Sequence, residues 1–177
     1  KIRVGVVGLG AVARAVHLPR LTQALGITLV GVTDACEERT KDIAHLYDVK
    51  GYSSYVCLCE SEDVDAVFIL TPPSTNLDVF EVACENRKHI FCEKPMTLNV
   101  DEGETMVRKA SKAGVVLMIG YMMRFSPDIK LLKHMLPLLE GDLRAQTRYT
   151  RSLPPSKATF QYERSLGGGA LFEMGIH

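Results

Sequence analysis

Glu93, Lys94 and Pro95 directly follow an expected strand at residues 88–92, which ends in the apolar run Ile90-Phe91-Cys92. A proline cannot donate a hydrogen bond to a neighbouring strand, so the expected strand ends here. Lys94 is therefore expected at the carboxyl end of a strand, where open α/β sheets bind ligands. An ammonium group in such a place can stabilise negative charge on a reacting oxygen, although a lysine after a strand is more often a solvated loop charge.

A second pair of residues suited to chemistry is Glu173 and His177, which lie four positions apart. If residues 170–177 are helical, both side chains project from one face of the helix. Histidine is the side chain best suited to proton transfer near neutral pH. The same spacing also suits a helical salt bridge or a structural histidine, and on spacing alone that interpretation is the more common one.

A glycine-rich loop follows the first expected strand, residues 2–8, and opens a helix. Its G-x-G-x-x-A pattern is typical of loops that cradle the pyrophosphate of a dinucleotide. The first glycine permits the tight turn, the second lets the backbone approach the pyrophosphate, and the alanine lets the helix pack on the sheet. The loop consists of Gly8, Leu9, Gly10, Ala11, Val12 and Ala13.

Asp34 follows a second apolar strand, residues 27–33, and lies 21 positions after Ala13. An acidic residue at about this distance accepts hydrogen bonds from the adenosine ribose. The alternative is an N-cap for the helix that begins near Glu37. Because a carboxylate repels a 2′-phosphate, we expect NAD rather than NADP as the cofactor, while Arg39 nearby keeps NADP possible.

Strands and helices alternate along the first 120 residues, which predicts a doubly wound parallel α/β sheet with its ligand crevice at the carboxyl ends of the strands. The glycine loop, Asp34, Thr71-Pro72, Lys94 and Gly120 all fall at such ends. The expected strands are residues 2–8, 27–33, 64–70, 88–92 and 115–119. The expected helices run to about Leu25 with a split near Pro19, and over residues 38–46, 52–60, 74–86 and 99–112, the last ending at Gly114.

The pattern changes after Gly120. Residues 121–127 form a connection that contains Arg124, which either clamps the cofactor or substrate or makes an inter-domain ion pair. A helix over 128–140, closed by Gly141, and an alternating strand over 143–151 follow. These elements cannot bury an independent core. We therefore expect a dinucleotide-binding domain at 1–120 and, at 121–177, the beginning of an incomplete second domain.

The composition excludes several other classes of protein. Lys+Arg and Asp+Glu both number 21, so charge gives no reason to expect nucleic acid or an anionic membrane as a partner. No apolar run approaches the ~20 residues of a membrane-spanning helix. The five cysteines are irregularly spaced, as in a cytoplasmic protein with reduced thiols. No residues have metal-site spacing, and His17, His45, His89 and His134 are interpreted as surface or capping residues.

In combination, these motifs resemble the Gfo/Idh/MocA family of nicotinamide-dependent oxidoreductases over essentially all 177 residues. One dinucleotide loop is a weak signal, whereas five motifs in the same order and spacing are a specific one. The matching segments are residues 8–13, the Thr-Pro segment 71–75, Glu93-Lys94-Pro95, the Gly-Tyr-x-x-Arg-Phe segment 120–125, and the glycine-rich segment 167–177.

The resemblance implies a Rossmann domain followed by a C-terminal α/β domain whose open sheet commonly forms the interface of a homo-oligomer. It also implies that Lys94 polarises the reacting oxygen and that His177 donates or accepts the proton. Glu173 stands where the family usually has aspartate, and Asn76 where many members have histidine. The residues expected around the cofactor are the glycine loop, Asp34, Arg39, Thr71, Pro72, Asn76, Glu93, Lys94 and Arg124.

The expected activity is therefore that of a cytoplasmic NAD(P)-dependent oxidoreductase. Its substrate would carry a hydroxy or keto group, as a sugar, a polyol or a related small molecule does. Two alternatives remain: a glycosidase-like hydrolase that retains its NAD, as some relatives do, and a catalytically weak NAD(H)-binding sensor or partner protein, which Glu173 and the short chain suggest.

Overall fold

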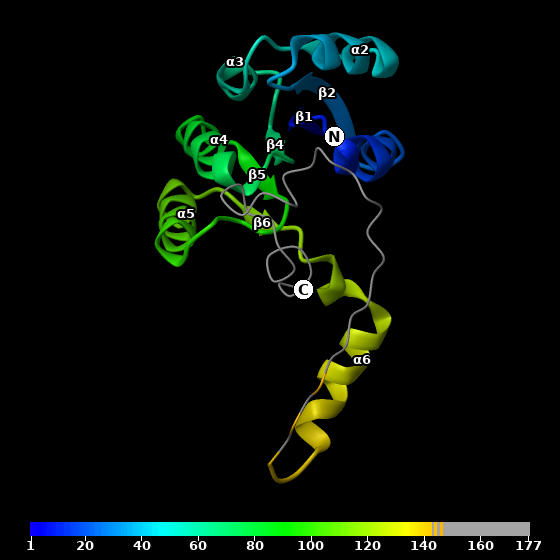
Figure 1. The fold of residues 1–177 in the computed structure, drawn as a ribbon, viewed down its shortest axis with the longest axis vertical. Coiled ribbons are helices and arrows are strands. Elements are labelled where there is room, and N and C mark those ends of the chain that lie inside the picture. The colour runs from blue at the N-terminus through cyan, green and yellow to red at the C-terminus, as the bar shows by residue number, and fades with distance from the viewer. Residues whose placement is uncertain (143, 145, 147–177) are drawn as a thin grey trace, which may run out of the picture.

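The computed structural model describes residues 1–142, 144 and 146, and a six-stranded sheet forms its centre (Figure 1). The strands lie in the order β3-β2-β1-β4-β5-β6, and each neighbouring pair is parallel. The predicted doubly wound sheet is thus confirmed, since the strand order reverses between β1 and β4. The strands are β1 (Ile2–Val7), β2 (Ile27–Thr33), β3 (Lys50–Gly51), β4 (Ala66–Ile69), β5 (His89–Cys92) and β6 (Leu117–Ile119).

Most helices follow the segments expected from the sequence, and α5 shows why. The Asn99 side chain accepts a hydrogen bond of 2.9 Å from the Glu102 N–H, and Gly114 ends the helix at a φ of 69°. The helices are η1 (Ala13–His17), α1 (Leu18–Leu21), α2 (Glu37–Tyr47), α3 (Tyr55–Glu60), α4 (Pro73–Glu85), α5 (Val100–Ala113), η2 (Met122–Phe125), α6 (Pro127–Met135) and η3 (Leu136–Leu138).

The first helix differs from the prediction, because it ends at Leu21 rather than near Leu25. Pro19 has no N–H group and cannot close a hydrogen bond to the carbonyl four residues earlier. The chain accommodates this with the π-helical turn η1, which leads directly into α1. The expected split therefore takes the form of a π-bulge, a feature that is frequent at functional sites.

Other boundaries also depart from the prediction, since β4 and β6 each begin two residues later than expected. α3 begins at Tyr55 rather than at residue 52. Lys50 and Gly51 form β3, a strand that is too short to show a periodic pattern in the sequence. The helix expected over 128–140 stops at Met135. Pro137 is the physical reason, because it removes the N–H that an α-helix would need there.

Helices cover both faces of the sheet (Figure 1). Successive residues of a strand point to opposite faces of the sheet, so each face has its own core. Ile69 belongs to the core beside α3, α4 and α5, and Val6 belongs to the core beside α1 and α2. Phe80 and Leu18 are fully buried in these two cores. Burial of each such side chain stabilises the fold by about 1.5–3 kcal/mol before entropy is counted.

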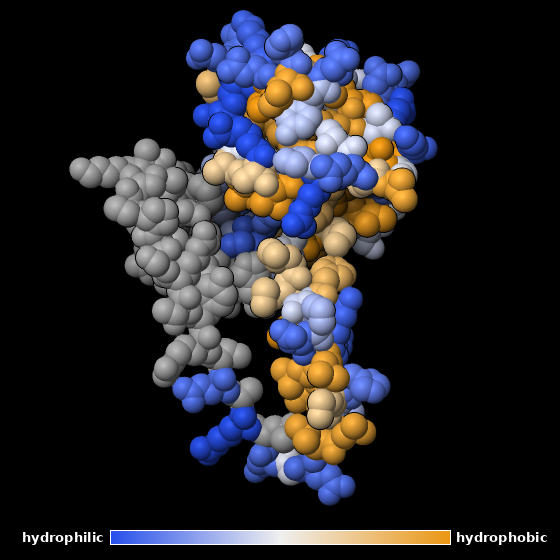
Figure 2. Space-filling view, turned by 90° about the vertical axis from the view of Figure 1, so that its right-hand side faces the viewer, coloured by the Kyte–Doolittle hydropathy of each residue, from blue (hydrophilic) through white to orange (hydrophobic). Residues whose placement is uncertain are grey.

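The chain after β6 leads away from the sheet through η2 and α6 (Figure 1). Many apolar side chains of this segment are exposed, and Figure 2 shows them as orange groups between blue ones. Within the described part of the chain, no helix is long and apolar enough to cross a membrane. The domain division at residue 120 stays a prediction, and the expected strand at 143–151 and the segments after it lie outside the described residues.

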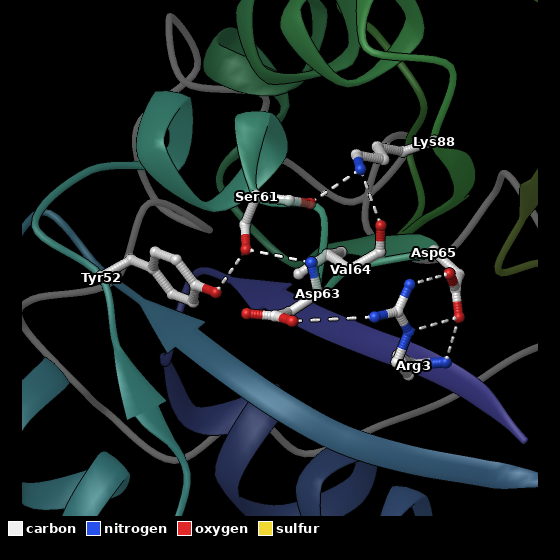
Figure 3. Close-up of polar contacts among 7 residues, drawn as sticks. All are labelled: Arg3, Tyr52, Ser61, Asp63, Val64, Asp65 and Lys88. Carbon is white, nitrogen blue, oxygen red and sulfur yellow. Dashed lines mark hydrogen bonds and ion pairs between the residues drawn. The ribbon is translucent and has the colours of Figure 1, made fainter.

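A polar cluster lies beside the beginnings of β1 and β4, and the Tyr52 side chain reaches it from the carboxyl end of β3 (Figure 3). The Lys88 Nζ donates to the carbonyl oxygens of Ser61 and Val64, at 2.8 Å and 2.7 Å. The Tyr52 hydroxyl bonds to the Ser61 Oγ at 2.9 Å. The two bonds from Lys88 satisfy backbone carbonyl oxygens of the loop between α3 and β4.

Arg3 and Asp65 join the beginnings of β1 and β4 in the same cluster (Figure 3). The Arg3 N–H and Nε donate to Asp65 Oδ2 at 2.8 Å and 3.1 Å, and Nη2 donates to Oδ1 at 2.7 Å. These hydrogen bonds from Arg3 lower the pKa of the Asp65 carboxyl from 3.8 to about 2. The bidentate geometry is the strong form of such a pair.

We expect Asp65→Asn to lower the thermal unfolding midpoint near neutral pH. The pKa of Asp65 is lower in the folded than in the unfolded chain, so ionised Asp65 favours folding above about pH 4 and loses this effect between about pH 4 and about pH 2. The gap between variant and wild type should close over that range. Asp63→Asn is the control, because its carboxylate lies 3.7 Å from Arg3 and is largely exposed. A gap that persists undiminished at about pH 2 would contradict the assignment.

Candidate active site

The predicted site residues follow strands that end in one row. Val7, Ile69 and Cys92 are paired in register across β1, β4 and β5, and the row continues to Thr33 on β2 and Ile119 on β6. The next residue of each strand stands one step beyond this row. The residues that directly follow these strands therefore lie along the same carboxyl edge, and they include Gly8, Asp34, Glu93 and Gly120. Thr71 lies two residues after the end of β4.

The glycine loop shows why each small residue is needed. Gly8 has a φ of +93°, and a Cβ there would lie 2.8 Å from the Leu70 carbonyl carbon and oxygen, so no other residue fits. Ala13 is buried. By contrast, a Cβ at Gly10 would meet nothing within 4 Å. The loop therefore has open space where a pyrophosphate would approach the backbone, and its residues fit a dinucleotide.

Asp34 has both carboxylate oxygens engaged within the protein. Oδ2 accepts from the Leu9 N–H at 2.7 Å, and Oδ1 accepts from the Cys36 N–H at 2.9 Å and from Arg39 Nη1 at 3.0 Å. The alternative role as an N-cap is wrong, because Cys36 is the N-cap residue of α2 and no side chain caps it. Asp34 instead holds the glycine loop against the end of β2.

Arg39 lies beside Asp34 at the surface. Its side chain is 41% exposed, whereas that of Asp34 is 10% exposed. The guanidinium group therefore offsets the charge of the carboxylate while keeping donors available to solvent or a ligand.

Asn76 braces the segment that follows Lys94. Its side chain is 1% exposed, its Oδ1 accepts from the Thr71 Oγ1 at 2.8 Å, and its Nδ2 donates to the carbonyl oxygens of Pro95 and Met96. The sequence predicted a contact between Asn76 and the cofactor. That contact stays a prediction. The amide bonds to protein groups on both sides and links the beginning of α4 to the chain after β5.

Glu93 is half-buried and forms hydrogen bonds with both His17 and Lys94. Its Oε1 lies 2.8 Å from His17 Nε2, and its Oε2 accepts from the Lys94 N–H at 3.0 Å. Burial raises the pKa of the Glu93 carboxyl, but the hydrogen bonds from His17 and Lys94 lower it more, so the pKa lies below its ordinary value of 4.5. Glu93 is therefore an anion at neutral pH. Lys94 itself is half-buried at this edge.

His17 is a site residue that the sequence interpretation missed, since surface or capping status was expected for it. Its side chain is 14% exposed and contacts Glu93. The spacing held a usable signal: His17 follows Ala13 by four residues and shares the helix face that packs on the sheet. His89 also has a partner, because its Nδ1 accepts from the Val116 N–H at 3.1 Å.

The remaining predicted residues are less informative. Arg124 is exposed in the last turn of η2, and Pro72 directly precedes α4. Glu173 and His177 lie outside the described residues. A hollow of about 780 Å³ lies between α5 and the chain after Pro95, and its lining is mainly apolar. It includes Met96, Leu98, Val100, Val107 and Tyr121, and none of the glycine-loop residues.

Known proteins match this chain along its whole length. A family model described as an oxidoreductase family with an NAD-binding Rossmann fold matches residues 2–121. Myo-inositol 2-dehydrogenase of Thermotoga maritima is 30% identical over 179 residues, covering 99% of this chain and 52% of the relative. scyllo-Inositol 2-dehydrogenase (NAD⁺) of Bacillus subtilis is 36% identical over 129 residues, covering 72% and 37%. The first two curated relatives are each about twice as long as this chain.

Solved structures share the fold. KijD10, a 3-ketoreductase from Actinomadura kijaniata in complex with NADP and TDP-benzene, has a TM-score of 0.84 at 27% identity, covering 99% of this chain and 54% of that one. A probable dehydrogenase from Thermotoga maritima has a TM-score of 0.72 at 30% identity, covering 77% and 41%. Because the family model matches residues 2–121, this chain belongs to the Gfo/Idh/MocA family of NAD-binding Rossmann oxidoreductases.

Proposed function

We propose that the complete protein is an NAD(P)-dependent oxidoreductase that interconverts a hydroxy and a keto group on a sugar, a polyol or a related small molecule. One observation carries the proposal: the glycine loop and Lys94 stand along the same edge of the sheet. The names of the relatives, inositol dehydrogenases and a sugar 3-reductase, support the substrate class. They favour net redox turnover over the hydrolase alternative. Homo-oligomerisation and a cytoplasmic location stay predictions.

Different residues of this chain bind the cofactor, stabilise charge and transfer the proton. Main-chain N–H groups of the glycine loop and the helix N-terminus hold the pyrophosphate. The Lys94 ammonium group stabilises the negative charge that develops on the substrate oxygen as its proton leaves. His177, by resemblance to the family, takes up that proton in oxidation and returns it in reduction. A bound nicotinamide supplies the acceptor or donor for the hydride.

We propose that Asp34 and Arg39 together set the choice of dinucleotide. The diol of an NAD ribose can share the Asp34 carboxylate, which favours NAD. Because Arg39 lies 3.0 Å from the same carboxylate and is partly exposed, it reduces the repulsion of a 2′-phosphate and offers donors to it. Both dinucleotides are therefore used, with NAD preferred.

Lys94→Ala tests the proposed chemistry directly. Turnover of a panel of polyols with NAD should fall by about 100-fold, the usual cost of losing one charge-stabilising group. NADH binding, measured by its fluorescence, should change by less than about threefold, because the pyrophosphate is held elsewhere. Lys109→Ala, at a lysine on α5 paired with Glu81, is the control and should resemble wild type. Turnover that survives in Lys94→Ala would refute the mechanism, and a wild-type protein that binds NADH without turnover would favour the sensor.

Arg39→Ala tests the proposal on cofactor choice. It should weaken NADPH binding by about tenfold, a usual effect of losing one charge-assisted phosphate contact, and change NADH binding by less than about threefold. Lys41→Ala is matched to it, because Lys41 is an exposed cation on the same helix that pairs with Glu37. If Arg39→Ala weakens both dinucleotides equally, Arg39 acts only by holding Asp34 in place.

A further inference from the structure

Two parts of the site that are distant in the sequence meet at a single contact between His17 and Glu93. The His17 Nε2 and Glu93 Oε1 atoms lie 2.8 Å apart. An ionised carboxylate only accepts hydrogen bonds, so the imidazole Nε2 carries a proton and donates. The contact joins the helix that follows the glycine loop to the strand end that precedes Lys94.

Aromatic packing holds the imidazole of His17 in one orientation. Its ring centroid lies 5.4 Å from that of Phe91 and 6.1 Å from that of Phe68, and the two phenyl rings stack 4.6 Å apart. The surroundings leave only 14% of the His17 side chain exposed. A ring packed in this way has few other rotamers, so its hydrogen bond stays directed at Glu93.

Glu93 uses its other oxygen to hold the main chain of Lys94. The Lys94 N–H donates to Oε2 at 3.0 Å. Gly120 contributes space, because a Cβ there would come within 3.3 Å of the Glu93 carboxyl carbon. One carboxylate thus bonds His17 and the Lys94 backbone together, and rotating it would break both hydrogen bonds.

We propose that His17 is a positioning residue for Lys94. Through Glu93 it fixes the main chain from which the Lys94 side chain projects, and it makes this geometry depend on the placement of the dinucleotide helix. The proposal rests on the function proposed above for Lys94. A displacement of about 1 Å can cost about 100-fold in rate, so a support of this kind affects catalysis without touching a ligand.

A purely structural role for the same contact would have different consequences. If His17 only attached its helix to the sheet, losing it would affect stability and dinucleotide binding. A positioning role instead predicts a lower kcat and a looser Lys94 N–H. The Glu93 N–H is the internal reference, because it bonds to the Ile69 carbonyl at 2.9 Å within the sheet and does not depend on His17.

Three variants of the complete protein separate these roles. His17→Phe keeps an aromatic ring beside Phe68 and Phe91 but has no donor. His17→Gln places an amide N–H₂ near the position of Nε2 and can bond Glu93 again. His45→Phe makes the same exchange as the first variant at an exposed position on α2.

The measurements are steady-state kcat and KM, NADH affinity by fluorescence, and amide hydrogen exchange of Lys94 relative to Glu93. His17→Phe should lower kcat by about tenfold or more, change NADH affinity by less than about threefold, and speed Lys94 exchange selectively. His17→Gln should restore most of kcat and of the Lys94 protection. His45→Phe should resemble wild type.

Three results would overturn the proposal: equal losses in His17→Phe and His17→Gln, a loss confined to NADH affinity, or exchange that speeds equally at Lys94 and Glu93. Failure of the proposed function is distinguishable from these. Turnover that persists in Lys94→Ala would remove the catalytic role of Lys94, whereas amide exchange needs neither substrate nor dinucleotide and still reports whether His17 holds the Lys94 backbone through Glu93.

Discussion

The site depends above all on the common register in which the parallel strands end. Val7, Ile69 and Cys92 pair directly, and the hydrogen bonds continue one residue further: the Leu70 N–H donates to the Val7 carbonyl, and the Glu93 N–H to that of Ile69. Parallel pairing sends every strand to the same edge. A shift of one residue in any strand would turn its side chains to the opposite face and remove its contribution to the site.

Buried polar contacts refine what the register brings together. Asp34, Asn76 and Glu93 each occupy a position where a polar side chain is costly to bury, and each has hydrogen-bond partners for its oxygens. The bonds between Asp34 and Leu9, between Asn76 and Pro95, and between Glu93 and His17 join segments that are distant in the sequence. The carboxyl edge is therefore held by side chains as well as by the sheet, which favours a single geometry for the glycine loop and for Lys94.

The sequence sufficed for the features that local chemistry determines. Buried strands, the glycine loop and the caps at Asn99 and Gly114 each have a signature within a few residues, and the structure has them in place. The partners of His17 and Asp34 were not predictable in the same way. The His17 contact joins residues 76 positions apart, and the internal bonds of Asp34 depend on how closely α2 and the glycine loop approach each other.

The most direct test of this account is a crystal structure of the complete protein with bound NADH. We expect the pyrophosphate on the main-chain N–H groups of residues 10–13, and the nicotinamide ring beside Lys94, close enough to leave the substrate about 3–3.5 Å from the reacting carbon. A dinucleotide in the hollow along α5, or one whose nicotinamide points away from Lys94, would contradict the claim that the carboxyl edge of the sheet is the active site.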